Sequence, residues 1–334
     1  MIKKSTYLSK PFLLKPAAKD YLWGGTRLND DFAKGIDLKP LAETWECSTH
    51  PDGPSIVASG EYKGKMLTEV LQEHDEYLGT HPKTKGELPI LVKFIDAKQD
   101  LSVQVHPDDS YAMEHENGQF GKTEMWYVMD AAKDSHLIYG LNLDTDKETL
   151  RQSIADGNIE KYLRKVKVEK DDLFYVKAGT IHAIGAGALI AEIQENSNLT
   201  YRLYDYNRED KNGKKRELHI DKALEVANLK ASTEPVQPMR VLKYRPGCAS
   251  ELLCRCEYFE VYRMLIHTER CRDMVGYQSD STSFRVLVCI NGCGSIVMED
   301  GEIIPFFKGD TIFFPANSVK VRLHGEAQFL DVRG

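Results

Sequence analysis

Short segments typical of β-strands fill most of this chain. They are rich in β-branched and aromatic residues, and Gly, Pro, Asp or Asn bounds most of them. Many short strands separated by turn residues predict a sandwich, a jelly roll or a barrel. We therefore expect a mainly β protein, on the evidence of segments such as LPILVKFI, LSVQVH, EMWYVMD, LFYVKAG, ALIAEIQ, LTYRLYDY, FRVLVCI, GSIVME and VKVRL.

Helical patterns are few. Apolar residues recur three or four positions apart in three segments, at about 66–79, 145–166 and 219–230. This spacing places apolar side chains on one face of a helix. Because strands surround these segments, we expect the helices to be inserts in a β fold.

The 334 residues are enough for two domains. We expect a first domain at 1–235, which carries the helical inserts, and a second at 236–334, with a connector at about 230–248. A faint internal repeat supports this division, although two short β segments can also resemble each other by chance. DDLFYVKAGTIHAI (171–184) and GDTIFFPANSVKVR (309–322) align without gaps.

In this alignment His182 matches Lys320. Only the first unit therefore keeps a side chain able to bind a metal at this position. We expect the second unit to be metal-free and to have a structural role.

The composition excludes few functions. Hydrophobic residues make up 42% and charged residues 28% of the chain, which is ordinary for a protein with a buried core. A net charge of -7 does not favour nucleic-acid binding, but it leaves room for a local basic pocket. No stretch approaches the roughly 20 apolar residues of a membrane span, and we expect no signal peptide. Seven cysteines without CxxC spacing suggest a reduced, cytoplasmic environment.

One strand-like segment, LSVQVHPDD at 101–109, has an unusual polar face. Side chains alternate along a strand, so Ser102, Gln104 and His106 point the same way. A solvent-facing stripe would explain this pattern. A metal site inside a barrel is the more specific alternative.

Two further residues extend the second interpretation. Glu124 opens the segment EMWYVMD, and His182 lies in KAGTIHAIG. Together with Gln104 and His106 they offer two imidazoles, one carboxylate and one amide oxygen. Such a mixed nitrogen and oxygen set suits zinc, and manganese, iron, cobalt or nickel would also accept it.

AGTIHAIG resembles the second motif of the cupin superfamily, and QVHP followed by GKTEMWYV resembles a variant of the first, with Gln in place of the usual first His. That variant is typical of type I phosphomannose isomerases. Further segments resemble this family over the first two thirds of the chain: KDYLWGGTRL, AETWECSTHP, LPILVKFIDAKQDLSVQVHPDD and AGTIHAIGAGALIAEIQENSNLTYRLYDYNR. The resemblance implies two cupin-type jelly-roll domains, the second of them degenerate, and the absence of a large helical insertion resembles the short bacterial branch.

The resemblance also implies a role for each site residue. It makes Gln104, His106, Glu124 and His182 the ligands of one Zn²⁺ per chain. It places Arg202 at the active-site arginine, Glu192 and Lys122 in the catalytic pocket, and Arg208 and Ser102 where the sugar phosphate binds. Purely structural roles for some of these residues remain open. Arg202 and Arg208 could be surface partners of nearby acids, and Glu192 could be paired with Lys122 for structure alone.

The implied reaction interconverts mannose 6-phosphate and fructose 6-phosphate through a cis-enediol. A divalent ion would stabilise the developing negative charge, and a base within hydrogen-bond reach would carry the proton. We expect a small sugar phosphate as the only partner, with no nucleic acid and no membrane, and a monomer or weak homo-oligomer. The competing hypotheses are a paralogue acting on another phosphorylated sugar, a metal cupin oxygenase and a non-enzymatic sugar-binding cupin.

Overall fold

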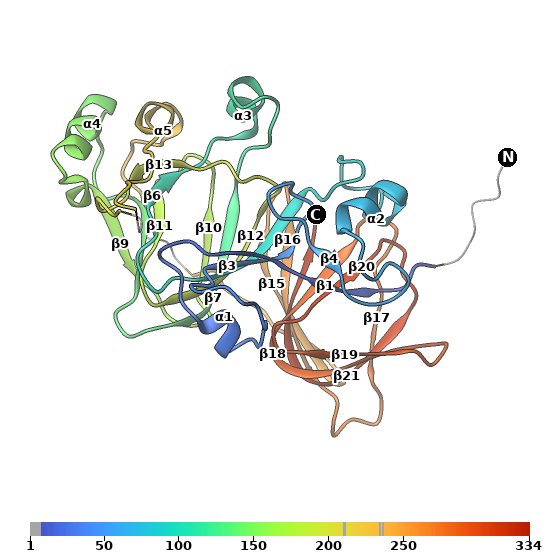
Figure 1. Cartoon of the computed structure of the whole chain (residues 1–334). Helices are drawn as coiled ribbons and strands as arrows, with labels where there is room; N and C mark the ends of the chain where they lie inside the picture. The colour runs from blue at the N-terminus through green and yellow to red at the C-terminus, as the bar shows by residue number, and fades with distance from the viewer. Residues whose placement is uncertain (1–7, 210–211, 234, 236) are drawn as a thin grey trace.

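Three antiparallel sheets carry the chain in the computed structural model, which describes residues 8–209, 212–233, 235 and 237–334 (Figure 1). Two of these sheets form the N-terminal domain. The six-stranded sheet has the order β10-β7-β12-β5-β3-β2 and the five-stranded sheet the order β13-β6-β11-β8-β9. Their strands are β2 (Ala17–Lys19), β3 (Glu43–Cys47), β5 (Ile90–Asp96), β6 (Val103–Val105), β7 (Glu124–Ala131), β8 (His136–Leu141), β9 (Leu163–Lys167), β10 (Leu173–Val176), β11 (His182–Ile184), β12 (Ala188–Glu195) and β13 (Tyr201–Tyr204).

The third sheet, of ten strands, forms the C-terminal domain. Its main path is β14-β15-β16-β21-β18-β20-β1-β4, with β17 paired to β21 and β19 paired to β18. The mainly β architecture predicted from the sequence is confirmed. The strands are β1 (Phe12–Lys15), β4 (Ile56–Val57), β14 (Lys243–Arg245), β15 (Cys248–Arg255), β16 (Glu260–His267), β17 (Val275–Tyr277), β18 (Arg285–Met298), β19 (Ile303–Phe307), β20 (Thr311–Phe314) and β21 (Val321–Arg333).

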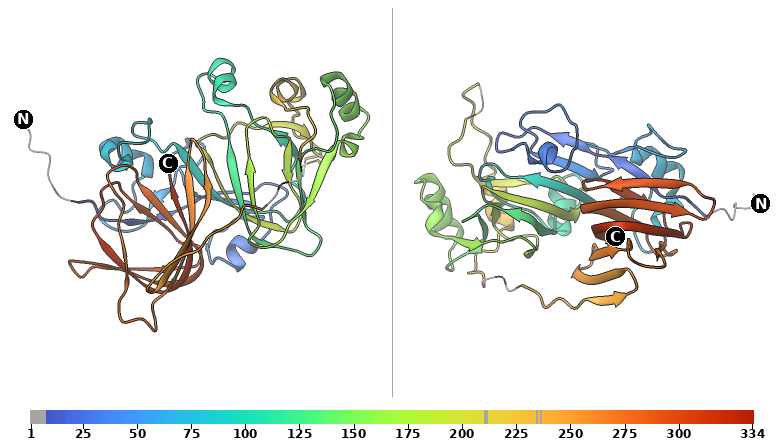
Figure 2. Two further views of the ribbon diagram at one scale, coloured as in Figure 1. Left: turned by 180° about the vertical axis from the view of Figure 1, so that it is seen from behind. Right: turned by 90° about the horizontal axis from the view of Figure 1, so that it is seen from below.

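The early strands β1 and β4 belong to this C-terminal sheet. Phe12 of β1 lies opposite Phe313 of β20 and stacks on its ring at 5.3 Å. A boundary at 235/236 therefore separates most strands of the N-terminal sheets from those of the C-terminal sheet. Of the described strands, only β1 and β4 precede this boundary in the sequence and still belong to the C-terminal sheet. Figure 2 shows residues 237–247, the second part of the connector, running along one side of the C-terminal domain.

The helices are short and lie outside the sheets. Those at the predicted inserts are α2 (Leu67–Glu73) with the 3₁₀ turn η1 (Asp75–Leu78), α4 (Lys147–Ala155) with η2 (Ile159–Lys161), and α5 (Ile220–Val226). The second insert is shorter than predicted. Gly157, with φ +69°, follows α4, and from Leu163 onward the chain is strand β9, which pairs with β8. Two helices were not predicted from the sequence, α1 (Arg27–Asp30) and α3 (Asp109–His115), and the Asp108 carboxylate caps the latter.

The six-stranded sheet is buried on both faces because the C-terminal domain packs against its outer face. Val92 and Phe94 of β5 join a core cluster with Val286 of β18 and Leu330 of β21. Lys93, between them, points the other way, into the N-terminal barrel. One side of β5 therefore holds the domains together, and the opposite side is free to carry polar groups.

Candidate metal centre and adjoining cavity

The polar stripe of 101–109 faces the interior of the N-terminal barrel. Gln104 on β6 lies directly opposite His182 on β11, and His106 follows the end of β6. Glu124 begins β7 in the other sheet. His106, Glu124 and His182 are at most 1% exposed, so the solvent-facing explanation of this stripe is wrong for His106.

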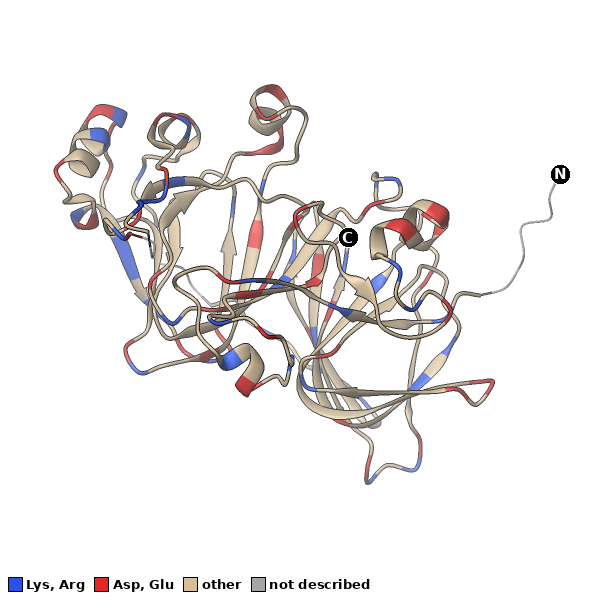
Figure 3. Ribbon diagram, in the orientation of Figure 1, with Lys and Arg blue, Asp and Glu red and all other residues tan. Residues whose placement is uncertain are grey.

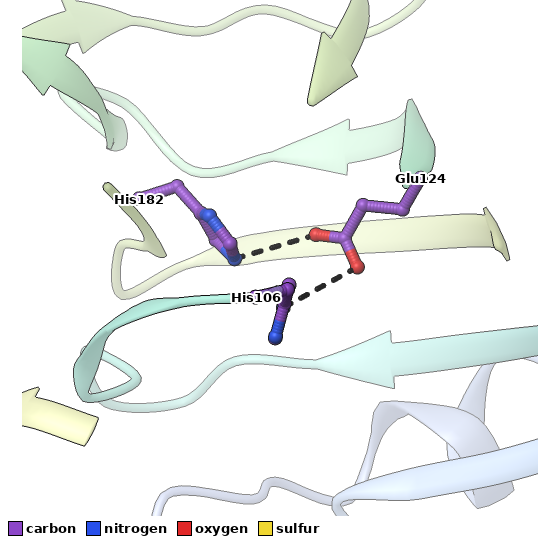
Figure 4. Close-up of side chains that lie close together, drawn as sticks. All are labelled: His106, Glu124 and His182. Atoms are coloured by element: carbon purple, nitrogen blue, oxygen red, sulfur yellow. Dashed lines mark ion pairs between the residues drawn. The ribbon is translucent and has the colours of Figure 1, made fainter. Parts of the chain in front are cut away.

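The two imidazoles converge on the Glu124 carboxylate (Figure 4). His182 Nε2 lies 3.4 Å from Glu124 Oε1, and His106 Nε2 lies 3.7 Å from Oε2. One ligand atom from each residue lies within 4.8 Å of the other two. Figure 4 shows the three side chains pointing toward one another, Glu124 and His182 from two strands and His106 from the loop after β6.

The donor set fits a divalent cation. His182 Nε2 and Glu124 Oε1 are buried and have no hydrogen-bond partner among the described residues. Buried polar atoms are rarely left without partners. The lone pairs of a histidine nitrogen and a carboxylate oxygen that face each other repel unless a proton or a metal ion lies between them. The other nitrogen of His182, Nδ1, lies 2.8 Å from the Thr180 carbonyl oxygen. That contact orients the ring so that Nε2 presents its lone pair to the centre.

The protonation states agree with this interpretation. Burial lowers the pKa of His182 to about 4 and lowers the pKa of His106 well below its usual value, so both imidazoles are neutral near pH 7. Burial, followed by repulsion from Glu192, raises the pKa of Glu124 to about 7. A positive ion at this position would remove the cost of keeping Glu124 ionised.

A cavity of about 250 Å³ adjoins the three side chains. Five of the six remaining predicted site residues line it: Ser102, Gln104, Lys122, Glu192 and Arg202. Arg208 does not. Its guanidinium is bound instead to Asp205 and to the Asp100 carbonyl oxygen, 2.5 Å away. Arg208 therefore makes the ion pair with a nearby acid that the alternative interpretation expected.

Arg202 is held at the cavity wall by its own contacts. Its Nη1 donates to the Glu217 carbonyl oxygen at 2.7 Å and its Nε to Ser102 Oγ at 3.3 Å. No ion pair joins it to an acid among the described residues, so the alternative of a surface salt bridge does not apply to it.

A chain of buried charges runs along the cavity floor. Lys122 Nζ lies 2.7 Å from Glu124 Oε2 and 3.8 Å from Glu192 Oε1. Lys93 Nζ lies 3.3 Å from Glu192 Oε1 and 3.9 Å from Glu43 Oε2. Although burial opposes ionisation, Lys122 and Lys93 together lower the pKa of Glu192. Lys122 therefore connects the metal candidates to a carboxylate that is ionised at neutral pH.

Sequence reasoning missed three charged lining residues, Glu43, Lys93 and Arg216. The signal for Lys93 was available, because it is the charged residue in the middle of the apolar run LPILVKFI. Arg216 had no such signal. It lies beyond the last strand of the barrel and reaches the cavity through Asp205, to which its Nε and Nη2 donate at 2.8 and 2.5 Å.

The rest of the described chain offers one other cluster of metal-ligand type, His267, Glu269 and Glu326, all exposed. All seven cysteines are free. Acidic and basic residues are interspersed on the helices and loops of both domains (Figure 3). Within the described residues, no helix has the length and apolar character needed to cross a membrane.

Comparisons with known proteins agree with this geometry. A family model for the catalytic domain of type I phosphomannose isomerase matches residues 12–136, and one for the cupin domain of mannose-6-phosphate isomerase matches residues 250–333. The mannose-6-phosphate isomerase ManA of Bacillus subtilis is 40% identical over 327 residues, which cover 96% of this chain and 98% of that protein. The mannose-6-phosphate isomerase of Streptococcus mutans is 40% identical over 259 residues, covering 78% of this chain and 80% of that protein.

Solved structures show the same fold. The crystal structure of the mannose 6-phosphate isomerase from Bacillus subtilis superposes with a TM-score of 0.87 at 38% identity, covering 98% of this chain and all of that one. A zinc-bound mannose 6-phosphate isomerase superposes with a TM-score of 0.75 at 16% identity, covering 97% of this chain and 99% of that one.

Proposed function

The chain belongs to the type I phosphomannose isomerase family, and we propose that it is a zinc-dependent isomerase that interconverts mannose 6-phosphate and fructose 6-phosphate through a cis-enediol. The observation that carries the proposal is the buried set of His106, Glu124 and His182 beside a charged cavity, in which His182 Nε2 and Glu124 Oε1 make no hydrogen bond with the described residues and His106 Nε2 lies 3.1 Å from Lys122 Nζ. We propose one Zn²⁺ per chain, with Gln104 as the fourth ligand.

The charge of the ligand set suits the reaction. Two neutral imidazoles, one neutral amide and one carboxylate bring a single negative charge, so a Zn²⁺ site keeps a net positive charge. When bound, zinc supplies a Lewis acid that stabilises negative charge developing on the sugar oxygens, an effect worth several kcal/mol.

The proton transfer falls to the buried carboxylate and lysine. Glu192 is ionised, and Trp126 Nε1 donates to its Oε2 at 2.9 Å, which fixes the carboxylate plane. Its Oε1 accepts no hydrogen bond of ordinary geometry from the described residues. We therefore assign Glu192 to accept the proton from the sugar carbon. Lys122, between Glu192 and Glu124, holds positive charge beside the reacting atoms.

Arg202 has a different task. A guanidinium does not readily lose a proton, so it acts by binding negative charge rather than as a base. Because Ser102 and Glu217 already accept hydrogen bonds from Nε and Nη1, the guanidinium is held in place before the substrate binds. No free energy is then spent on reorienting it during the reaction. We propose that Arg202 stabilises the enediolate.

The phosphate end of the substrate has two candidate arginines. Both Arg208 and Arg216 bind Asp205, but of the two only Arg216 lines the cavity. We propose that Arg216 contacts the phosphate and that Arg208 contributes by holding Asp205 in place. Ser102, on the cavity wall, remains a candidate contact to the sugar phosphate.

The free cysteines are consistent with the cytoplasmic location that we propose, and we propose a monomer or weak homo-oligomer. The decisive experiment is to incubate the purified protein with mannose 6-phosphate in D₂O and follow the formation of fructose 6-phosphate. An enediol exchanges its carbon-bound proton with solvent, so after many turnovers the sugar carries deuterium. Conversion without any carbon-bound deuterium at equilibrium would contradict the enediol. Preferred conversion of another phosphorylated sugar would identify a paralogue.

A further inference from the structure

The C-terminal domain contains a polar cavity of its own. It has a volume of about 350 Å³ and opens among strands β14, β15, β16, β17, β18 and β21. Its charged and hydroxylated lining residues are Arg245, Ser250, Glu260, Tyr262, Tyr277, Arg285, Asp331 and Arg333. The adjoining core of this domain is apolar, with Met264, Leu287 and Phe329 among its buried residues. Charged groups at the edge of an apolar core are costly unless they have a function or complete partners.

This cavity occupies the strand positions of the catalytic cavity. The ungapped alignment of the two repeat segments matches Val176 with Phe314. Val176 lies opposite Glu124 in the first domain, and Phe314 lies opposite Arg285 in the second. Arg285 therefore stands where the first domain has its metal-binding carboxylate.

The two domains also correspond at the next inward-facing position, two residues further along the same strands. Two residues after Glu124, Trp126 lies opposite Glu192. Two residues after Arg285, Leu287 lies opposite Asp331. Asp331 thus takes the position of the catalytic carboxylate. A permanent positive charge has replaced the metal ligand, while a buried carboxylate is kept beside it.

The charges of this second cavity leave an excess of one positive charge. Arg285 Nη1 lies 2.9 Å from Asp331 Oδ2, and Arg333 Nη2 lies 2.5 Å from Glu260 Oε1. Arg245, exposed at the mouth, donates to the Gly276 carbonyl oxygen at 3.2 Å and has no ion pair among the described residues. Three arginines thus face two carboxylates.

Three buried polar atoms of the lining residues make no hydrogen bond of ordinary geometry with the described residues. They are the Tyr277 hydroxyl, Asp331 Oδ1 and Glu260 Oε1. Burial, followed by the nearby Asp331 carboxylate, raises the pKa of Tyr277, so these two groups face each other. Tyr277 is 8% and Asp331 6% exposed. A hydroxyl that can donate and a carboxylate that can accept therefore lie side by side in the cavity, without a hydrogen bond of ordinary geometry between them. Unpartnered buried atoms of this kind mark a place where a polar ligand completes the hydrogen bonds.

We propose that the C-terminal cavity is a second, metal-free site that binds a small sugar phosphate. The arginines supply forked donors for the phosphate, and Tyr277 and Asp331 supply the donor and acceptor that sugar hydroxyls need. The inference goes beyond the proposed isomerase function, because it concerns a second cavity in the other domain. It also revises the purely structural role expected for the second unit.

Equilibrium dialysis of the zinc-loaded protein against labelled mannose 6-phosphate counts the sites. We expect two sites per chain in the wild type. Tyr277→Phe removes a hydroxyl that faces the Asp331 carboxylate without a hydrogen bond of ordinary geometry, so the variant should stay folded, as a thermal unfolding curve would show. It should weaken one of the two sites by about threefold to tenfold, the usual effect of a lost hydrogen bond between neutral groups. Tyr244→Phe, which removes an exposed hydroxyl on β14, is the matched control and should keep both sites.

The outcomes separate this inference from the proposed function. A single site that Tyr277→Phe leaves unchanged would overturn the inference, as would two sites that the variant does not affect. A single site that Tyr277→Phe abolishes would support the second cavity and contradict substrate binding in the first.

Discussion

Replacing Arg202 by alanine separates charge stabilisation from metal binding. Arg202 makes no hydrogen bond or ion pair with His106, Glu124 or His182, so Arg202→Ala should keep its zinc. The variant loses the hydrogen bonds to Glu217 and Ser102, each worth about 0.5–1.5 kcal/mol, so folding stability should fall by about 1–3 kcal/mol. Loss of a pre-organised donor to a developing oxyanion costs about 10²–10³-fold in kcat, or about 2.7–4 kcal/mol.

The assay measures kcat and KM for mannose 6-phosphate, together with zinc content and the urea midpoint. We expect kcat to fall at least about 10²-fold while zinc stays at the wild-type level, because only contacts that strengthen in the transition state change the chemical step. Arg151→Ala on α4 is the control, since Arg151 is a half-exposed arginine paired with Asp221 on another helix. A wild-type kcat for Arg202→Ala would refute the assignment and leave Arg202 as a structural arginine.

Three further expectations follow from the same geometry. His182→Ala should lose both zinc and activity, as mass spectrometry and the isomerase assay would show, and stoichiometric zinc in the variant would remove His182 from the ligand set. Arg216→Ala should raise KM by about tenfold or more and change kcat little, since the phosphate changes little during the reaction; a larger effect of Arg208→Ala would reverse the two roles. Burial raises the pKa of Glu195 to about 8, so the folded state holds a proton that the unfolded state releases above about pH 4.5. The free energy of unfolding of the wild type, measured by urea titration, should therefore fall between about pH 5 and 8 relative to that of Glu195→Gln. If the difference between the two proteins did not change with pH, Glu195 would be ionised in the folded state.

Local patterns predicted the barrel and its metal candidates well. The alternation of Gln104 and His106 with apolar neighbours sets which face of β6 points inward, and this depends only on strand geometry. The convergence of Glu124 on the two histidines needs two sheets to face each other. The family motifs implied that arrangement, whereas strand periodicity by itself does not.

The parts that could not be predicted depend on long-range packing. Whether Lys93 points to solvent or to the cavity is decided by the C-terminal domain, which covers the opposite face of β5. The place of β1 in the C-terminal sheet depends on pairing with β20, almost the whole chain away. The sequence predicted that the helical insert continues through residues 163–166, but these residues pair with β8 and form a strand.

Zinc titration of the metal-free protein tests the central claim most directly. The protein is stripped with a chelator, and activity toward mannose 6-phosphate is measured as zinc is returned in steps. We predict no activity without metal, a linear rise, and saturation at one zinc per chain, with no recovery at any zinc concentration in His106→Ala. Full activity in the metal-free protein, or recovery in His106→Ala at the wild-type stoichiometry, would contradict a zinc-dependent isomerase built on His106, Glu124 and His182.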